Sequence, residues 1–281
     1  MVCDMRCDQL LREISAVLRA AGIENAGNEA RWLVCEICKL SVADILSGRM
    51  ITEDKAGEVR KAAARRAGHE PLQYILGSAP FGELELLVTP DVLIPRPETE
   101  VLVDLVSADL PPNGKVLDLG CGSGAIALLL AYRRHDAVVT AVDKSCAALK
   151  IAVKNAERYS LQTRVKFFES DLFSALDEAE KFDFIAANLP YVTFEEYAEL
   201  DDEVRVYEPQ MALTAADDGA ELMLHAVKEA AHFLTADGRV IFEMSPHQTE
   251  RIAAALKAEN FKTEVIRDQF GKERFVYGRR R

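Results

Sequence analysis

The sequence of 281 residues lacks any long apolar run, which limits where the protein is expected to work. No stretch approaches the roughly 18 consecutive apolar residues that indicate a transmembrane helix. The first residues, Met1-Val2-Cys3-Asp4, show no basic segment followed by an apolar stretch, so no secretory signal is expected. We therefore expect a cytoplasmic protein without a membrane partner.

Positive charge is also scarce, since 34 Lys and Arg residues stand against 46 Asp and Glu residues, giving a net charge of -12. Nucleic-acid phosphates are bound by basic surfaces, so this balance disfavours nucleic acid as the main partner, although a local basic patch stays open. The five histidines are scattered along the chain and indicate neither a metal site nor a general base.

Cysteine is present six times, and four of these residues raise the question of a metal site. Cys3, Cys7, Cys35 and Cys38 could in principle form a four-thiolate zinc site. Against this, Cys35 and Cys38 lie within a helical pattern, and a buried free cysteine is a common core residue. We therefore predict no metal, and no disulfides in a cytosolic protein.

The hydrophobic pattern divides the chain into parts. From Asp8 to about Gly68 apolar residues recur at helical spacing, which predicts a small helical bundle without strands. From Ala79 to Val88 apolar residues alternate around a glycine, which predicts a hairpin or extended linker, and prolines then stiffen the chain. The predicted parts are an N-terminal helical domain at 1–77, a linker at 78–98 and a second domain at 99–281.

Beyond Pro112 short strands and helices alternate. Strands are predicted at 116–119, 138–142, 165–168, 182–187, 240–242, 263–266 and 274–277. Helices are predicted at 125–131, 146–159, 221–234 and 246–260, and Thr99 is predicted to cap a further helix at 100–108. The alternation predicts a doubly wound, Rossmann-like α/β domain with a seven-stranded sheet and helices on both faces. The last two strands should form a hairpin that leaves one strand antiparallel.

A glycine loop follows the first strand of this domain and opens a helix. The loop residues are Gly120, Cys121, Gly122, Ser123 and Gly124. Glycines at such a place allow positive φ and let the backbone approach a ligand closely. Alone, the loop is weak evidence, because it also satisfies the fingerprint of enzymes that bind dinucleotides.

Two acidic residues follow the next strands. Asp143 ends the second strand about 20 residues beyond the loop, where a carboxylate suits a ribose diol; the alternative is a helix-capping carboxylate. Asp171 follows the third strand and could reach an adenine, although a solvated turn is an almost equal alternative. Both residues are therefore candidates for binding a nucleoside cofactor.

The segment Asn188-Leu189-Pro190-Tyr191 favours S-adenosylmethionine over a dinucleotide as the cofactor. The strand at 182–187 should deliver Asn188 to the same crevice as the glycine loop. The Asn188 side-chain oxygen and the Pro190 carbonyl can accept both N–H groups of a planar NH2, which orients its lone pair toward an electrophilic methyl group. Tyr191 can cover the planar group. The sequence thus indicates an N-methyltransferase that uses S-adenosylmethionine.

Several motifs together resemble the HemK/PrmC family of protein-glutamine N5-methyltransferases, which modify peptide chain release factors. They are, in order, Pro71-Leu72-Gln73-Tyr74-Ile75-Leu76-Gly77, Ile94-Pro95-Arg96-Pro97-Glu98-Thr99-Glu100, the loop from Asp118 to Leu128, Asp143, Asn188-x-Pro190-Tyr191, Tyr207-Glu208-Pro209 and Gly271-Lys272-Glu273-Arg274. The glycine loop is shared by many methyltransferases, whereas the segment around Arg96 joined to a helical N-terminal domain is much more specific. The resemblance spans nearly the whole chain.

The resemblance implies methylation of the glutamine in the Gly-Gly-Gln loop of class I release factors by a class I methyltransferase domain. The helical domain would dock the release factor, and the enzyme is expected to be a monomer. The implied cofactor residues are Arg96, Gly120, Cys121, Gly122, Ser123, Gly124, Asp143, Asp171, Leu172 and Asn188. The implied glutamine-binding residues are Asn188, Leu189, Pro190 and Tyr191, with Asn188, Pro190 and Tyr191 as the catalytic set. Arg96 and Glu98 would close the cofactor pocket, or simply form a packed linker.

The chain departs from the family pattern at three places. Leu189 stands where the family usually has proline, Leu172 where relatives can carry an aromatic residue beside the adenine, and Met244-Ser245 where Ile-Gly is common. Two other functions compete with this interpretation. One is an N6-adenine methyltransferase acting on RNA or DNA, since the same turn suits an adenine amino group. The other is an adaptor that binds the cofactor without turnover.

Overall fold

The computed structural model describes residues 4–215 and 218–281, and these divide into two compact units. One unit contains the chain up to Gly77 together with Asp201–Tyr207. The other contains Ser78–Leu200 and Glu208–Arg281. In the described residues no helix is both long and apolar enough to cross a membrane.

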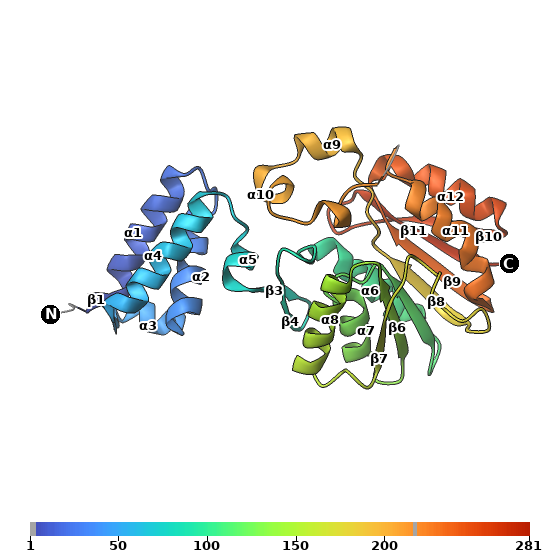
Figure 1. The fold of residues 1–281 in the computed structure, drawn as a ribbon, viewed down its shortest axis with the longest axis horizontal. Coiled ribbons are helices and arrows are strands. Elements are labelled where there is room, and N and C mark those ends of the chain that lie inside the picture. The colour runs from blue at the N-terminus through green and yellow to red at the C-terminus, as the bar shows by residue number, and fades with distance from the viewer. Residues whose placement is uncertain (1–3, 216–217) are drawn as a thin grey trace. The chain divides into compact units, whose positions relative to one another are not determined.

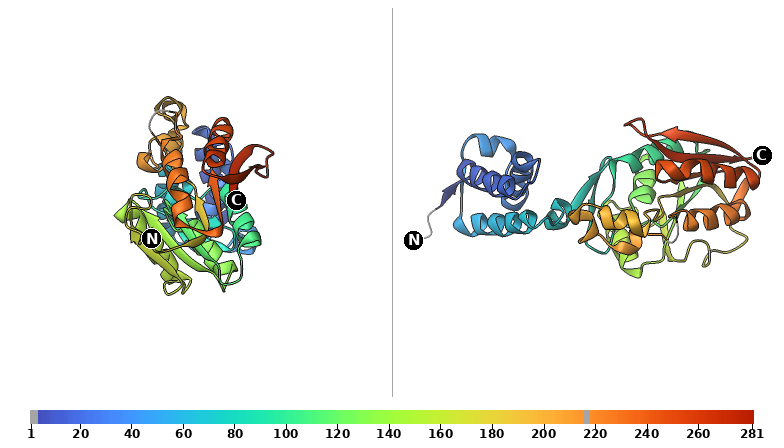
Figure 2. Two further views of the ribbon diagram at one scale, coloured as in Figure 1. Left: turned by 90° about the vertical axis from the view of Figure 1, so that its right-hand side faces the viewer. Right: turned by 90° about the horizontal axis from the view of Figure 1, so that it is seen from above.

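The part of the first unit up to Gly77 is a helical bundle, blue to teal in Figures 1 and 2. Its helices are α1 (Cys7–Ala20), α2 (Ala26–Cys38), α3 (Val42–Leu46), α4 (Glu53–Ala67) and α5 (Leu72–Leu76). Leu10, Ile14 and Leu18 are fully buried at three- to four-residue steps, as the periodicity predicts. The expectation of no strand was wrong, because β1 (Met5–Arg6) pairs with β2 (Met50–Ile51). Strands of two residues are too short to give a periodic signal.

The cysteines of the bundle contribute to its packing. Cys7 is fully buried, and its Sγ donates to the Asp44 and Ile45 carbonyl oxygens at 3.5 and 3.8 Å. Burial raises the pKa of the Cys35 and Cys38 thiols, which disfavours the thiolate form that binds metals. Among the described residues no group of three or more His, Cys, Asp or Glu side chains could hold a metal, and Cys3 lies outside that part.

A short distant segment belongs to this helical unit. Arg66 of α4, only 6% exposed, donates to Glu29 of α2 and to Glu203 of α10 (Asp202–Arg205), in each case at 2.6 Å. The Tyr207 hydroxyl donates to the Gly68 carbonyl oxygen at 2.8 Å. The contacts with Glu203 and Tyr207 join residues more than a hundred positions apart, so no local pattern in the sequence predicts them.

The second unit is an α/β unit with a seven-stranded sheet in the order β10-β11-β9-β8-β5-β6-β7. The strands are β5 (Lys115–Leu119), β6 (Val138–Asp143), β7 (Val165–Glu169), β8 (Phe182–Ala187), β9 (Leu234–Glu243), β10 (Phe261–Arg267) and β11 (Glu273–Arg280). β5 to β9 pair in parallel, whereas β11 is antiparallel to both of its neighbours. β10 and β11 are the red strands beside α12 (Thr249–Ala258) in Figures 1 and 2. This arrangement confirms the predicted sheet and its terminal hairpin.

Helices cover both faces of the sheet (Figure 1). One face carries α6 (Pro97–Asp109), α7 (Ala125–Arg133) and α8 (Cys146–Arg158), together with the hairpin β3 (Ser78–Phe81) and β4 (Leu84–Leu87). The other face carries α11 (Glu221–Phe233) and α12. The remaining short helices are α9 (Phe194–Glu199), η1 (Gln210–Ala212) and η2 (Pro246–Gln248). Val116 and Leu117, neighbours on β5, point into opposite cores, as strand geometry requires.

The start of α6 differs from the prediction. The helix begins at Pro97 with Arg96 as its N-cap, so Thr99 lies in the first turn and does not cap it. Proline is favoured at the first helical position because its missing N–H would have no intrahelical partner there. The Thr99 hydroxyl is thereby free for another contact, which lies in the site described below.

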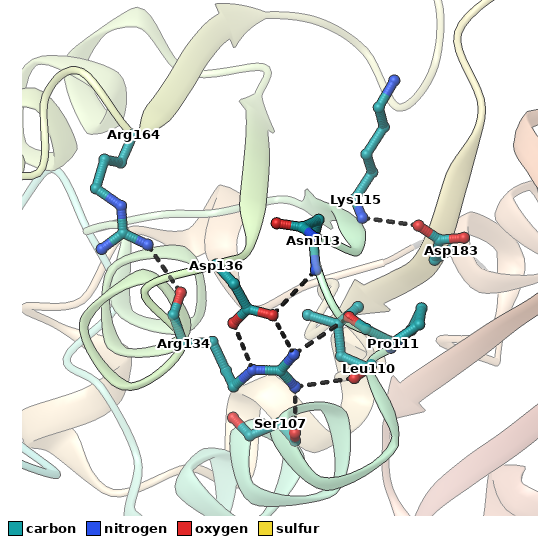
Figure 3. A network of polar contacts seen from close by, with 9 residues as sticks. All are labelled: Ser107, Leu110, Pro111, Asn113, Lys115, Arg134, Asp136, Arg164 and Asp183. Carbon is teal, nitrogen blue, oxygen red and sulfur yellow. Dashed lines mark hydrogen bonds and ion pairs between the residues drawn. The ribbon is translucent and has the colours of Figure 1, made fainter.

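Arg134, the C-cap residue of α7, binds the backbone at the end of α6 (Figure 3). Its guanidinium donates to the carbonyl oxygens of Ser107, Leu110 and Pro111 at 2.7, 2.9 and 3.2 Å. It also forms an ion pair with Asp136 at 2.8 Å, and that pairing lowers the pKa of the Asp136 carboxyl. Carbonyl groups in the last turn of a helix lack partners within the helix, so this arginine satisfies those of Ser107 and of the C-cap residue Leu110. Pro111 lies beyond the helix, and its carbonyl oxygen also accepts from the Gly114 amide at 3.0 Å.

We predict that Arg134→Met lowers the free energy of unfolding by about 2–3 kcal/mol, because these carbonyl groups lose a charged donor. Thermal and urea unfolding measure the change. Arg279→Met is the matched control, since the Arg279 side chain is 51% exposed and forms an ion pair with Asp237 at 3.6 Å. This control should stay within about 0.5 kcal/mol of the unmodified protein. Equal losses in both variants would contradict the role of Arg134.

Candidate active site

The α/β unit contains a cavity of about 410 Å³ at the carboxyl ends of β5, β6, β7 and β8. Most of the predicted site residues line it: Arg96, Gly120, Cys121, Gly122, Ser123, Asp143, Asp171, Leu172, Asn188, Leu189 and Pro190. Of the predicted set, Gly124 and Tyr191 are not among the described lining residues. Carboxyl ends of parallel strands are where open α/β sheets bind ligands, so the topology itself gathers these residues.

The backbone of the glycine loop explains its composition. The Gly120 and Cys121 amides both donate to the Val142 carbonyl oxygen, at 2.8 and 2.9 Å, which turns the chain sharply after β5. Gly120, Gly122 and Gly124 have φ of 71°, 54° and 84°, a region that side chains rarely tolerate. Gly124 is the N-cap of α7, so it connects the loop to the helix and is not among the described residues that line the cavity.

Asp143 has the properties expected for binding a diol. Its Oδ2 accepts from the Gly122 amide and its Oδ1 from the Ser145 amide, each at 2.8 Å. Ser145 itself caps α8 by accepting from Ala148 at 3.1 Å, so the carboxylate is not used as the helix cap. Burial raises the pKa of Asp143. Each carboxylate oxygen retains a second lone pair that can accept from a hydroxyl group.

A second buried carboxyl, Asp118, was not predicted as a site residue. Its Oδ2 accepts from the Ala127 amide at 3.1 Å, and its Oδ1 is buried without a hydrogen-bond partner in the described structure. Complete burial raises its pKa to about 7. Asp118 anchors the first turn of α7 behind the glycine loop. A carboxyl within an otherwise apolar strand, directly before that loop, was the signal available in the sequence.

The turn after β8 supplies two cavity-lining residues that carry an oxygen acceptor. Asn188 Nδ2 donates to Thr99 Oγ1 at 3.1 Å, so the Asn188 Oδ1 atom is the one left to accept from a ligand. Pro190, two residues on, also lines the cavity and contributes a backbone carbonyl group. Asn188 and the glycine loop therefore face one cavity, as the topology predicted.

Two residues far along the chain hold this turn. Gln248 Nε2 donates to the Tyr191 carbonyl oxygen at 3.0 Å and to the Asp218 carbonyl oxygen at 2.9 Å. Gly219 leaves space for the same carbonyl group, because a Cβ atom there would lie 2.1 Å from the Tyr191 oxygen. Neither contact follows from a sequence motif.

Leu189 explains how the turn accommodates a residue other than proline. Its side chain is 4% exposed and packs into the core on the α11 and α12 face. A Cβ atom added at Gly120 would lie 2.9 Å from Leu189 Cδ2, so the leucine packs directly against the glycine loop. Leu189 thus links the two halves of the site by packing, while the acceptor atoms belong to its neighbours.

Tyr191 lies partly buried against the same core. Burial raises its pKa to about 12, and the nearby positive charge of Arg274 opposes this shift. The described lining of the cavity does not include Tyr191, so its expected place over a planar substrate group stays a prediction.

The proline-rich segment before α6 is held by Glu208. Glu208 is 5% exposed and accepts from Arg96 Nη2 at 2.5 Å and from the Ile94 amide at 3.2 Å. Arg96 lines the cavity, whereas Glu98 is not among the described residues that line it. Glu98 lies in the first turn of α6, where its negative charge interacts favourably with the helix dipole. Sequence reasoning named Glu208 only as part of a motif and missed its role in building the site.

The candidate residue Asp171 and the two other departures from the family pattern also have places in the structure. Asp171 is half exposed and forms an ion pair with Lys144 at 2.7 Å at the cavity edge. Leu172 is buried, lines the cavity and adopts φ of 51°. Met244 is fully buried in the core, and the Ser245 amide donates to Gln248 Oε1 at 3.2 Å, which helps orient the side chain that holds the turn.

Comparison with known families gives two matches. Residues 97–203 match the methyltransferase small domain, and residues 9–77 match the PrmC N-terminal domain. The chain is 36% identical over 265 residues to a release factor glutamine methyltransferase of Geobacter sulfurreducens, covering 93% of this chain and 92% of the relative. It is 35% identical to the enzyme of that name from Deinococcus radiodurans, covering 98% and 99%.

Solved structures agree on the fold. A methyltransferase from Pyrococcus furiosus superposes with a TM-score of 0.54 at 17% identity, covering 80% of this chain and 98% of that protein. A 16S rRNA methyltransferase from Thermus thermophilus gives a TM-score of 0.52 at 22% identity, covering 73% and 50%. At these identities the likeness concerns the fold alone.

We predict that Asp143→Asn weakens binding of S-adenosylmethionine about 100-fold, because hydroxyl groups lose a charged acceptor worth roughly 1.5–3 kcal/mol for each hydrogen bond. Isothermal titration calorimetry measures the dissociation constant. Asp237→Asn is the control, and its affinity should change by less than about threefold, since Asp237 is 86% exposed and is not among the residues that line the cavity. Unchanged affinity in Asp143→Asn would remove Asp143 from the cofactor site.

Proposed function

The chain belongs to the family of release factor glutamine methyltransferases, and from this premise we propose how its residues act. The reaction is the transfer of a methyl group from S-adenosylmethionine to the side-chain amide nitrogen, N5, of the glutamine in the Gly-Gly-Gln loop of a peptide chain release factor. When bound, S-adenosylmethionine supplies an electrophilic methyl group for direct displacement.

The cofactor-binding part of the proposal assigns the nucleoside to the glycine loop and Asp143. The fit is supported by the open lone pairs on Asp143 and by the positive φ of Gly120 and Gly122, which lets the backbone approach a ligand. Arg96 and Leu172, on the cavity wall, would enclose the same group. Asp171 would lie beside the adenine from the cavity edge.

The substrate-binding part assigns the glutamine carboxamide to Asn188 and Pro190. An amide nitrogen is a poor nucleophile because its lone pair is delocalised. Asn188 Oδ1 and the Pro190 carbonyl would accept its two N–H groups, orient the nitrogen and stabilise the positive charge that develops on it. The observation that carries this proposal is the hydrogen bond from Asn188 Nδ2 to Thr99, which leaves Oδ1 as the acceptor in the cavity.

The proposal also assigns roles outside the cavity. The helical unit would dock the release factor, and this is supported by several large apolar side chains that it exposes: Val17, Trp32, Val42, Leu46 and Met50. The site is assembled from residues of one α/β unit, which supports a monomeric enzyme. Since release factors act in translation termination, we place the enzyme in the cytoplasm.

One assay tests the proposed substrate. Labelled S-adenosylmethionine is offered with a release factor, with the same factor carrying its loop glutamine changed to alanine, and with bulk RNA. We expect label only in the unmodified release factor. Label in RNA would instead support an N6-adenine methyltransferase, and no label in any sample would support an adaptor that binds the cofactor without turnover.

We predict that Asn188→Ala lowers kcat at least 100-fold, because one of two acceptors for the amide N–H groups is lost from the preorganised site. The affinity for S-adenosylmethionine should change less than in Asp143→Ala, which removes a proposed cofactor ligand. Steady-state kinetics with a release factor and calorimetry with the cofactor measure the two effects. A parallel loss of kcat and cofactor affinity in Asn188→Ala would argue against its role as substrate acceptor.

A further inference from the structure

Behind the Asn188 turn lies a buried chain of three polar side chains from separate elements. Asn188 follows β8, Thr99 belongs to the first turn of α6, and Glu243 ends β9. Asn188 Nδ2 donates to Thr99 Oγ1 at 3.1 Å, and the Thr99 hydroxyl lies near the Glu243 carboxyl, whose ionised form it favours. Thr99 is 4% exposed and Glu243 2% exposed, so water is largely absent from these contacts.

Hydrogen-bond chemistry determines which of these three side chains donates and which accepts. An ionised carboxylate can only accept, and a hydroxyl group has a single proton to donate. When Glu243 is ionised, Thr99 donates to it, and the Thr99 oxygen must then accept from Asn188 Nδ2. If Glu243 no longer takes the proton, Thr99 can donate to Asn188 Oδ1 instead. The Asn188 NH2 group would then face the substrate NH2, and two donors would oppose each other.

We propose that Glu243 and Thr99 are positioning residues that fix the orientation of the Asn188 amide, so that Oδ1 always faces the substrate nitrogen. This inference rests on the proposed function, because it concerns the acceptor assigned there to the glutamine amide. Neither residue is required to touch the reacting atoms for this role.

The burial of Glu243 is costly, which argues against a purely structural role. Its Oε2 is buried without a hydrogen-bond partner among the described residues. Burying a carboxylate that is incompletely paired disfavours folding, and a glutamine or leucine would fill the same space without a charge. Groups kept at a cost in stability are frequent at functional sites.

The charged and titratable groups around Glu243 have opposing effects. Arg274 and Arg96 favour its ionised form, whereas Glu98 opposes it. Tyr191 lies close enough for the Glu243 charge to raise the tyrosine pKa. Burial is the dominant influence and raises the pKa of Glu243 to about 7, so its charge changes within the range where the enzyme can be assayed.

The direction of the pH dependence follows from this chain. Above pH 7 Glu243 is ionised and Thr99 is held as an acceptor for Asn188. Below pH 7 a protonated Glu243 can donate to Thr99 and release the Thr99 proton toward Asn188 Oδ1. At saturating S-adenosylmethionine we therefore expect kcat to fall as the pH decreases through about 7.

Stability should show the opposite trend. The folded-state pKa of Glu243 lies above its ordinary value of 4.5, so the folded state binds more protons than the unfolded state between these values. The contribution of Glu243 to stability therefore decreases as the pH rises from 4.5 through about 7. Glu243→Gln removes this cost, and its Tm relative to the unmodified protein should be higher at pH 8 than at pH 5.

The test compares Thr99→Val, Thr99→Ser and Glu243→Gln at pH 8, with a release factor as substrate and saturating S-adenosylmethionine. Thr99→Val and Glu243→Gln should each lower kcat about tenfold, as expected when one orienting hydrogen bond is lost. Thr99→Ser keeps the hydroxyl group and should stay within about threefold of the unmodified enzyme. Cofactor affinity should remain unchanged in all three variants.

Two further readouts separate positioning from a general structural effect. The double variant Thr99→Val with Glu243→Gln should lose no more kcat than Thr99→Val alone, because both residues act through one chain of hydrogen bonds. Glu243→Gln should also lose the fall of kcat below pH 7. The proposal would be overturned if the double variant lost the product of the two single losses of kcat. It would also be overturned if kcat of Glu243→Gln still fell below pH 7 as in the unmodified enzyme.

The proposed function and this inference fail in different ways. If the unmodified protein does not methylate the release factor, the proposed function itself is overturned. If the unmodified protein methylates it and Thr99→Val has the same kcat, only the positioning role is overturned.

Discussion

The hydrogen bond from Asn188 to Thr99 decides which atom of the Asn188 amide faces the cavity. An amide side chain presents an acceptor on one side and donors on the other, and only the acceptor suits a substrate nitrogen that carries two protons. The β8 strand can place Asn188 at the sheet edge, but it cannot select between these two orientations. That selection requires α6 to begin where it does, with Thr99 in its first turn.

The rest of the site is arranged to keep the turn after β8 in place. Gln248 binds its backbone from the η2 segment, and Gly219 leaves room for the same carbonyl group. Leu189 packs between the turn and the glycine loop. Glu208 holds the chain that leads into α6 and therefore acts on Thr99 indirectly. The position of this turn thus depends on hydrogen bonds and packing from four separate parts of the α/β unit.

The sequence predicted most of what local chemistry and strand alternation determine. The seven-stranded sheet, its terminal hairpin and the gathering of Asp143 and Asn188 at one edge follow from patterns within short windows. Contacts between distant residues, such as Arg66 with Glu203, leave no such pattern. The role of Thr99 was misjudged because threonine before a helical run usually caps it, whereas Pro97 had already started the helix.

Leu189 shows how the turn after β8 accommodates a residue other than proline and keeps both of its proposed acceptors. The two acceptors of the turn are the side-chain oxygen of Asn188 and the backbone carbonyl of Pro190, and neither belongs to the intervening residue. The proline ring restricts φ at Pro190, and Gln248 holds the carbonyl group of the next residue, so the turn is fixed without a second proline. Leu189 instead fills the space against Gly120. The residues tolerated at position 189 should therefore be limited by side-chain volume. Those tolerated at position 188 should be limited by the need for a hydrogen-bond acceptor.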